Sequence, residues 1–324
     1  MARYHGSRWL FITAPVAVNH GAPVAVFPGD TRNAGVVKRE NLRVVYHTDE
    51  VHRRMRPFLK WPGGKYRIID RIRAKLPMGR RLIEPFVGSG AVFLNVDYDA
   101  YLLSDINEDL IHVYKTLQEH GEAFISACER LFTEENNTSE RYYELRTEFN
   151  ETTDVWRKSV LFLYLGRHGY NGLIRYNKDG GYNVPFGRYR RPYFPEKEMR
   201  FFAERSKSAR FVCQDFRHVM EQAKSGDVVY CDPPYVPLSS TANFTDYAAG
   251  GFGPKDQQDL ADLAASLGEQ GIPVLISNHQ SEFTEAAYRL AQVERFDVQR
   301  FISCDGRNRN TAKEVLALFG AVPE

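Results

Sequence analysis

From Arg81 onward, short apolar runs alternate with longer stretches that have helical spacing. The runs read RLIEPF at 81–86, YLLSDIN at 101–107, RFVCQDF at 210–216, DVVYCDPPY at 227–235 and IPVLISNH at 272–279. Apolar runs of this length, separated by helix-like segments, are typical of a parallel sheet with covering helices. The pattern therefore predicts an α/β fold.

The pattern changes between residues 109 and 204. Amphipathic stretches compatible with helices follow one another at 110–131, 141–150 and 156–164. A polar, glycine-rich segment comes next. We interpret 109–204 as a mainly helical domain inserted between the two parts of the domain that holds the sheet, 55–108 and 205–324.

Residues 1–54 differ from the rest of the chain. They show no sustained helical periodicity and are punctuated by Pro, Gly and Asn, so we interpret them as an irregular extension outside the main fold. Met55 stands just before the first dense cluster of motifs, and a translational start there is an alternative.

Composition narrows the classes of protein and partner. With 43% hydrophobic and 26% charged residues, the chain of 324 is neither disordered nor fibrous. The 43 Lys and Arg nearly balance the 41 Asp and Glu, so attraction to a polyanion requires a local basic face.

The four cysteines form no CxxC pair, which predicts no metal site and fits a reduced cytoplasm. No apolar run predicts a membrane helix or a signal peptide.

A glycine-rich turn, EPFVGSG at 84–90, follows one predicted strand and precedes a predicted helix. Glycines there let the backbone approach a ligand closely. Asp105 ends the next predicted strand, where it can accept hydrogen bonds from ribose hydroxyls. Because the third glycine of GxGxxG is missing, a nucleoside without a diphosphate is the better ligand. A tight turn beside a solvated acid is the alternative.

The sequence Asp232-Pro233-Pro234-Tyr235 directly follows the apolar strand VVYC. Two consecutive prolines fix a rigid turn at the carboxyl end of the strand, where open α/β sheets bind ligands. Asp232 and a carbonyl of this turn can grip an exocyclic amino group while Tyr235 stacks on a planar base. Cys231 should point the other way, into packing. A turn that only ends the strand is the alternative.

Six segments together carry a family resemblance. They are FLKWPGGKY at 58–66, IEPFVGSG at 83–90, SDIN at 104–107, YNGLIRYN at 170–177, NVPFGRY at 183–189 and DPPYVPLSSTANF at 232–244. In identity and order they resemble the motifs of the bacterial DNA adenine methyltransferases, the Dam family. The resemblance runs from Arg56 to the C-terminus, although KDGGY at 178–182 and SCDGRNRNTAK at 303–313 depart from it.

The resemblance implies S-adenosylmethionine as the methyl donor and adenine N6 as the acceptor. Trp61 and Lys65 would line the methionine end of the donor, with Lys65 near its carboxylate. Asp105 would hold the ribose, and Asp215 and Phe216 would lie beside the adenine of the donor. The remaining residues of the expected cofactor site are Glu84, Phe86, Gly88, Gly90 and Asp232. Hydrogen bonds from N6 to Asp232 and the Pro233 carbonyl would then aim the nitrogen lone pair at the methyl group.

The segment 165–200 holds eight Lys or Arg against three acids in a nearly neutral chain. Aromatic residues alternate with these charges; they are Tyr170, Tyr176, Tyr182, Phe186, Tyr189 and Tyr193. Basic and aromatic residues together suit phosphate contacts and base stacking. A solvated helical face over a tyrosine-rich small core is the alternative. The adenine acceptor that the resemblance implies must leave the duplex to reach such a pocket, so base flipping is expected.

The resemblance also implies how DNA would be read. Arg175 would contact a guanine edge, Leu173 and Pro185 a thymine methyl, and Lys60 with Tyr189 the opposite end of the site. Tyr170 would insert into the DNA duplex, and Asn171 would contact the thymine that loses its partner. Further expected DNA contacts are Asn177, Arg188, Ser239, Thr241 and Asn243, the last three to backbone phosphates. The expected target is GATC.

Our hypothesis is a site-specific adenine-N6 methyltransferase of the doubly wound α/β class that acts on double-stranded DNA. It would work without a metal, as a monomer, in the bacterial cytoplasm at the nucleoid or as a phage product. The modification partner of a restriction enzyme is a close alternative. A nicotinamide-dependent Rossmann enzyme would leave the DPPY motif and the basic insert unexplained. A DNA-binding protein without activity is disfavoured by the intact Asp232 and Lys65.

Overall fold

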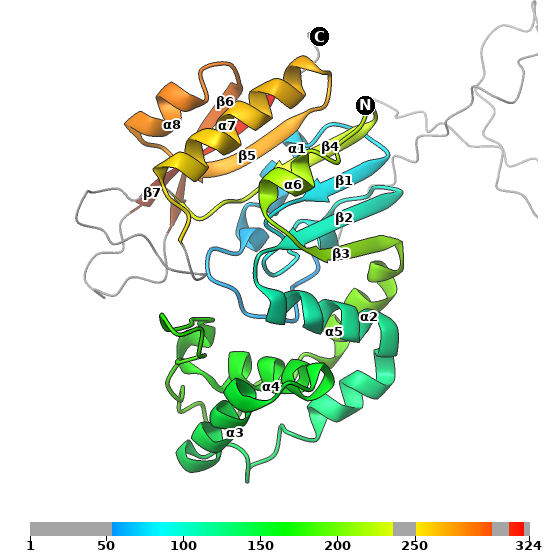
Figure 1. Cartoon of the computed structure of the whole chain (residues 1–324), viewed down its shortest axis with the longest axis vertical. Coiled ribbons are helices and arrows are strands. Elements are labelled where there is room, and N and C mark those ends of the chain that lie inside the picture. The colour runs from blue at the N-terminus through cyan, green and yellow to red at the C-terminus, as the bar shows by residue number, and fades with distance from the viewer. Residues whose placement is uncertain (1–53, 236–250, 300–310, 321–324) are drawn as a thin grey trace, which may run out of the picture. The chain divides into compact units, whose positions relative to one another are not determined.

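The protein contains one seven-stranded sheet within the residues that this computed structural model describes, 54–235, 251–299 and 311–320. Its strands are β1 (Arg81–Glu84), β2 (Ala100–Asp105), β3 (Ala209–Cys213), β4 (Asp227–Cys231), β5 (Val274–His279), β6 (Gln292–Gln299) and β7 (Thr311–Phe319). They lie in the order β3-β2-β1-β4-β5-β7-β6 (Figure 1). The pairings among β1 to β5 are parallel, and β7 is antiparallel to both of its neighbours. The predicted mostly parallel α/β sheet is confirmed.

The order of the strands places a crevice at the centre of the sheet. The chain moves outward from β1 through β2 to β3, and outward in the other direction from β4 to β5. β1 pairs in parallel with both β2 and β4. At such a switch point the connections leave in opposite directions, which opens a space beyond the carboxyl ends of the two central strands. The glycine-rich turn follows β1, and the DPPY motif follows β4.

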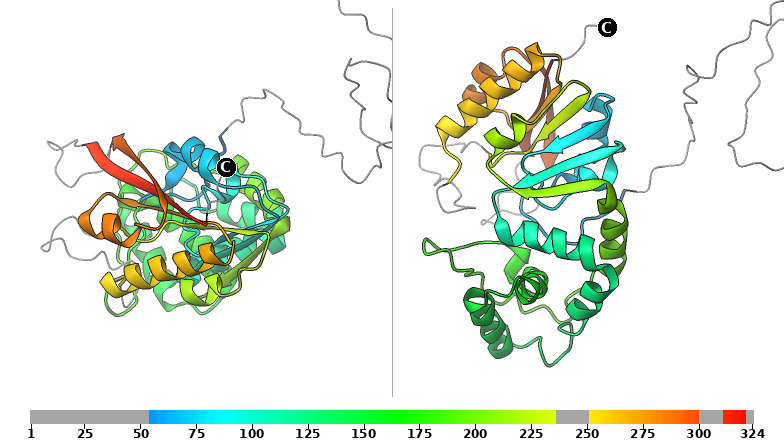
Figure 2. Two further views of the ribbon diagram at one scale, coloured as in Figure 1. Left: turned by 90° about the horizontal axis from the view of Figure 1, so that it is seen from above. Right: turned by 45° about the vertical axis from the view of Figure 1, so that its right-hand side comes forward.

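Alternate residues of the strands pack against helices on opposite faces. Leu82 and Val228 belong to the core on one face, where α1 (Ile69–Lys75) packs. Ile83 and Val229 belong to the core on the other face, with α6 (Phe216–Met220) and α7 (Pro254–Glu269) (Figure 2). Helix α8 (Glu282–Ala287) is followed by Tyr288, which is part of the same second core. The sheet is therefore covered on both faces, as in doubly wound folds.

Cys231 lies in the second core and is fully buried. It packs on the opposite side of the strand from Asp232, as its alternation with that residue predicts.

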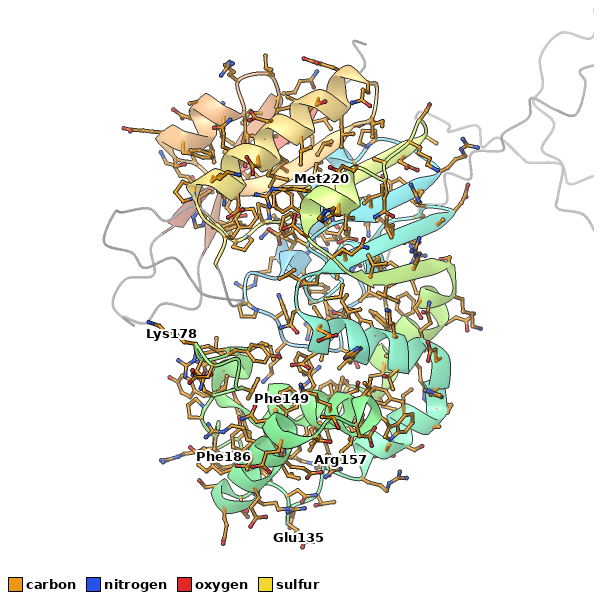
Figure 3. The ribbon with its side chains drawn as sticks, viewed as in Figure 1. Glu135, Phe149, Arg157, Lys178, Phe186 and Met220 are labelled. Carbon is orange, nitrogen blue, oxygen red and sulfur yellow. The ribbon has the colours of Figure 1, made fainter. Side chains whose placement is uncertain are left out.

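The three amphipathic stretches of the insert form helices, as predicted. They are α2 (Glu108–Glu129), α3 (Ser139–Glu151) and α4 (Val155–His168), and α5 (Glu196–Arg205) follows. Asn107, Thr138 and Asp154 cap the first three helices by accepting backbone N–H groups. Helix α2 contacts both β3 of the sheet and helix α4. Figure 3 shows Phe149 of α3 and Arg157 of α4 in the helical part of the molecule, away from the sheet. One continuous core joins the sheet to these helices.

One expected element is different. We predicted a helix after the glycine-rich turn, but only the short 3-10 helix η3 (Phe93–Asn95) forms there. The connection from Glu84, the last residue of β1, to Ala100, the first of β2, is instead made of the glycine-rich turn and this one helical turn. The Asn95 side chain also bonds backbone groups of Met55 and Ala91, which fixes the single turn in place.

No helix in the described ranges is long and apolar enough to cross a membrane. Residues 1–53 of the expected extension lie outside these ranges, as do Ser239, Thr241 and Asn243.

Candidate functional site

A cavity of about 570 Å³ opens beyond the carboxyl ends of β1, β2 and β4. Eleven of the twelve residues expected for catalysis and cofactor binding line it, namely Trp61, Lys65, Glu84, Phe86, Gly88, Asp105, Asp215, Phe216, Asp232, Pro233 and Tyr235. The twelfth, Gly90, is not among the lining residues. Its φ of +72° is a left-handed backbone conformation that favours glycine, which gives it a role in forming the turn. The cavity brings together segments that lie far apart in the sequence.

Asp232 is held by a cation and a hydroxyl. Lys65 Nζ lies 2.8 Å from Asp232 Oδ1, and Ser277 Oγ donates to the same oxygen at 2.9 Å. Burial raises the pKa of the Asp232 carboxyl, and the Lys65 ammonium and the Ser277 hydroxyl lower it. Lys65 is only 6% exposed, and its Nζ also lies 4.5 Å from the centre of the Tyr235 ring. The structure thus pairs Lys65 with the DPPY motif.

The DPPY turn is anchored by buried amides that the sequence analysis did not identify. Gln257 of α7 donates to the Pro234 carbonyl at 2.6 Å. Asn278 of β5 donates to Gln257 Oε1 at 3.2 Å and to the Tyr288 hydroxyl at 3.0 Å. Gln257 and Asn278 are almost fully buried. Asn278 could have been found as a polar residue within an apolar run, because buried amides need partners.

Asp105 and the glycine-rich turn support each other. The Gly88 N–H donates to Asp105 Oδ2 at 3.1 Å, and the Asn107 N–H donates to Oδ1 at 3.0 Å. Gly88 has a φ of +46°, and a Cβ at this position would lie 3.0 Å from the Trp61 ring. Only glycine fits both demands. Burial raises the pKa of Asp105 to about 6, although the N–H groups of Asn107 and Gly88 oppose this.

Glu84 is a buried acid with an unsatisfied oxygen. It is 2% exposed, and its Oε1 has no hydrogen-bond partner among the described residues. Burial raises the pKa of Glu84 well above its ordinary value, a backbone N–H of Phe93 lowers it, and the charge of Asp232 raises it further. A carboxyl group in this condition suits a ligand that brings an ammonium or another N–H donor.

Three phenylalanine rings form one wall of the cavity. Phe86 and Phe216 stack with their centres 5.5 Å apart, and Phe252 meets the Phe86 ring edge-on at 5.6 Å. An apolar aromatic wall of this kind suits a planar base. Phe252 was not predicted, because nothing in its neighbourhood of glycines indicates that it returns to the sheet.

The hairpin 169–187 leaves the end of α4 and carries most of the expected DNA contacts. Its chain is joined by bridges between Gly169 and Phe186 and between Tyr176 and Tyr182. Exposed residues of the predicted set on this hairpin and just after it are Tyr170, Asn171, Arg175, Asn177, Pro185 and Arg188, and Leu173 is half-buried. Lys178 lies at the tip of the hairpin (Figure 3). Ile174, Tyr182 and Val184 point into the core instead.

The aromatic residues of this segment therefore divide into buried and exposed ones, and the expectation that Tyr182 is available for base stacking was wrong. Tyr182 is only 1% exposed and donates to the Leu173 carbonyl, so it cannot stack on a base. Tyr176 is half-buried, and its hydroxyl donates to Asp109 Oδ2 at 2.7 Å. Tyr170 and Tyr193 remain exposed. The tyrosine-rich core that was the alternative exists beneath an exposed polar surface.

Several of the expected reading residues are held in position by neighbours. Arg175 Nε donates to Asn183 Oδ1 at 2.7 Å, which fixes the guanidinium on the hairpin. Lys60 Nζ lies 4.5 Å from the centre of the Tyr189 ring. A Cβ on Gly172 would lie 2.2 Å from the Lys60 side chain, so a glycine is required there. Asn177 Oδ1 accepts the N–H of Gly181 at 2.7 Å and closes the tip of the hairpin.

The described residues contain no group of three or more His, Cys, Asp or Glu that could hold a metal ion.

Comparisons with known proteins agree with this geometry. The sequence profile of the D12 class N6 adenine-specific DNA methyltransferases matches residues 61–302. The chain is 53% identical over 265 residues to the "DNA adenine methylase" of Serratia marcescens, covering 82% of this chain and 98% of the relative. It is 50% identical over 268 residues to that of Vibrio cholerae serotype O1 strain O395 and over 264 residues to that of Escherichia coli K12. These matches cover 82% of this chain and 97% and 95% of the two relatives.

Proposed function

Because the chain belongs to the D12 class N6 adenine-specific DNA methyltransferases, we propose that it methylates the adenine of GATC in duplex DNA after turning that base out of the helix. The enzyme is an adenine-specific DNA methyltransferase, and S-adenosyl-L-methionine is its methyl donor. The observation that carries the proposal is the Asp232 carboxylate, held in a rigid turn at the edge of the cavity by Lys65 and Ser277.

The residues of the cavity fit this methyl donor. When bound, S-adenosyl-L-methionine supplies a methyl carbon made electrophilic by its sulfonium. Asp105 has the placement of an acceptor for ribose hydroxyls, at the end of β2. The apolar wall that Phe86, Phe216 and Phe252 form suits the adenine ring. The unsatisfied Glu84 Oε1 suits the ammonium of the methionine end.

Asp232 would activate the substrate amine by accepting a hydrogen bond from it. Adenine N6 is a poor nucleophile because its lone pair is delocalised into the ring. Hydrogen bonds to Asp232 and to the Pro233 carbonyl favour a more pyramidal nitrogen, whose lone pair can be aimed at the electrophile. Tyr235 offers an aromatic face beside this pair of acceptors. As the bond from N6 to the methyl carbon forms, the bond from that carbon to sulfur would break, the donor would leave as a neutral thioether, and the surplus N6 proton would pass to Asp232 and then to solvent. Catalysis then comes from positioning and electrostatics, with no covalent enzyme intermediate.

The hairpin 169–187 supports recognition of a sequence in duplex DNA. Tyr170, which is 52% exposed, would fill the space that the target base leaves, and Asn171 beside it would contact the unpaired partner base. Arg175 would read a guanine edge, with Leu173 and Pro185 at a thymine methyl group. Lys60 and Tyr189 would read the other end of the site. Ser239, Thr241 and Asn243 are proposed to contact phosphates near the extruded base.

The test is the state of GATC sites in cells. Plasmid DNA is prepared from cells that lack adenine methylation and express either the natural chain or Asp232→Ala. It is then digested with restriction enzymes that are blocked by, or that require, methylated GATC. We expect only the natural chain to protect the DNA from the first kind of enzyme and to allow cleavage by the second, while the purified variant still binds DNA. Methyl groups that appear only on cytosine, or at adenines outside GATC, would refute the proposal.

A further inference from the structure

Asp232 receives both of its hydrogen-bond donors from the described residues on one carboxylate oxygen. Lys65 Nζ lies 2.8 Å from Oδ1, and Ser277 Oγ lies 2.9 Å from the same atom. A carboxylate oxygen has two lone pairs, so these donors occupy Oδ1 and fix the rotation of the carboxylate. Oδ2 is then the oxygen that a substrate amine can use.

The Ser277 hydroxyl is itself held by a tyrosine. Tyr230 OH lies 3.0 Å from Ser277 Oγ. The Ser277 hydroxyl has two acceptors in reach, Asp232 Oδ1 at 2.9 Å and the Cys231 carbonyl at 3.4 Å, and the nearer, charged carboxylate takes its single proton. Because that proton is used, Tyr230 donates to Ser277. Burial, and after it the charge of Asp232, raises the pKa of Tyr230 well above its ordinary value, so the phenol keeps its proton. Tyr230, Ser277 and Asp232 thus form a chain of hydrogen bonds in which each hydroxyl donates toward the Asp232 carboxylate.

The register of the sheet explains why these residues meet. β4 and β5 pair in parallel with Cys231 opposite Ile276, so the residues that follow, Asp232 and Ser277, are neighbours. Tyr230 precedes Asp232 by two positions and therefore shares its face of the strand. Tyr230 is 1% exposed and Ser277 is 0% exposed. Hydrogen bonds to a charged group in such a buried position contribute more than exposed ones.

We propose that Ser277 and Tyr230 are positioning residues that orient the Asp232 carboxylate so that Oδ2 accepts an N6 hydrogen of the target adenine. The inference rests on the proposed function, which assigns this carboxylate to that amine. Both residues act through Asp232 and not on the reacting atoms. The Pro233 carbonyl accepts the second N6 hydrogen.

The groups that face Asp232 make the effect of removing Ser277 predictable. Lys65 from the 3-10 helix η2 (Lys65–Arg67) brings a positive charge, and Glu84 at the end of β1 brings a second buried acid. From β5, His279 packs its ring 4.0 Å from that of Tyr235. Ser277 is the neutral donor of this group that lowers the pKa of Asp232. Without its hydroxyl, Asp232 holds its proton to a higher pH.

The experiment measures steady-state methylation of a GATC duplex from pH 5 to 9. In Ser277→Ala we expect kcat to fall about 10- to 100-fold, as for a lost hydrogen bond to a charged group. KM values for DNA and for S-adenosyl-L-methionine stay near those of the natural chain. The acid limb of kcat/KM moves to higher pH, because Asp232 must be ionised to accept the amine. Tyr230→Phe gives a smaller shift in the same direction, and Ser277→Thr restores the limb.

Ser206→Ala is the matched control. Ser206 is also fully buried, but its hydroxyl donates to the Ala203 carbonyl at 2.8 Å, far from Asp232. This variant should keep the acid limb of the natural chain. An unchanged limb in Ser277→Ala would overturn the inference, even if kcat falls, because a purely structural loss does not move a pKa. If Ser277→Ala does not fold, Tyr230→Phe decides by the same criterion. If the natural chain forms no N6-methyladenine, the proposed function fails first, and this result is distinct from an unshifted limb.

Discussion

Asp105 shows how one residue serves two requirements that oppose each other. Its carboxyl orders the glycine-rich turn through the N–H groups of Gly88 and Asn107, and the same burial raises its pKa to about 6. An acid whose pKa is higher in the folded state than in the unfolded state favours folding while it is protonated. That contribution is fully present below the unfolded pKa, near 3.8, and is lost as the pH rises through about 6.

We therefore expect Asp105→Asn to change the pH dependence of stability in the absence of the methyl donor. The difference in unfolding free energy between the variant and the natural chain should shift in favour of the variant by about 1–3 kcal/mol from pH 4 to pH 8, because the variant has no charge to bury. Urea denaturation at both pH values measures the difference. The exposed Asp179→Asn should follow the natural chain. Parallel curves for Asp105→Asn and the natural chain would contradict the expectation.

Arg175 should determine one base of the target. Its guanidinium is oriented by Asn183, and a bidentate contact with guanine contributes about 1–3 kcal/mol of discrimination. Arg175→Ala should lose that preference in competition assays with duplexes altered at one outer position. Lys178→Ala removes the same charge from the tip of the same hairpin and should weaken all sequences alike. An unchanged preference in Arg175→Ala would refute the assignment.

At the scale of elements, the sequence predicted five strands because each is a continuous apolar run between helix-like segments. β6 and β7 escaped this reasoning. β6 lies at the edge of the sheet and carries polar residues such as Glu294 and Asp297, which an edge strand tolerates because one side faces solvent. β7 had a signal in its apolar residues 315–319, but its antiparallel position depends on the sheet as a whole.

The residues of the candidate site were predictable to different degrees for a physical reason. Asp105 ends β2 and Asp232 directly follows β4, so their convergence follows from parallel pairing. Gln257, Ser277 and Phe252 come from the second half of the sheet and from the start of α7. Their roles depend on register and on side-chain contacts, which a single sequence does not display. The exposure of Tyr170 and the burial of Tyr182 could not be separated by composition either.

Helix α7 should stabilise the DPPY turn through one side chain. Gln257→Leu keeps the volume but removes the donor to the Pro234 carbonyl and the acceptor for Asn278. We expect a loss of about 1–3 kcal/mol of unfolding free energy, because buried groups lose their partners, and a lower kcat. Urea denaturation and initial rates measure the two effects. Gln258→Leu, on the exposed side of the helix, should change stability by at most about 0.5 kcal/mol. Equal effects of the two changes would contradict this role.

At the scale of the whole molecule, the described fold begins at residue 54, shortly before the family match, which starts at residue 61. Met55 donates its backbone N–H to Asn95 Oδ1 at 2.8 Å. An ammonium at the start of a shorter chain can make the same hydrogen bond. The contact of Arg54 with Asp70 lies at the surface, where ion pairs contribute little.

We therefore expect a chain that starts at Met55 to methylate DNA with the kcat and KM of the full chain. Its unfolding free energy should differ by about 1 kcal/mol or less. Rates on a GATC duplex and urea denaturation of both proteins test this. A shortened chain that does not fold would show that the first 54 residues are a structural part of the enzyme.

The hydrogen bond from Tyr176 to Asp109 joins two regions with different tasks. Asp109 sits in the first turn of α2, four residues after Asp105, and Lys158 of α4 pairs with its other oxygen. Replacing the hairpin with a foreign one to change the target would also remove the hydrogen bond from Tyr176 to Asp109 at the start of α2. A successful graft must therefore keep a phenol at this position, even though it reads no base.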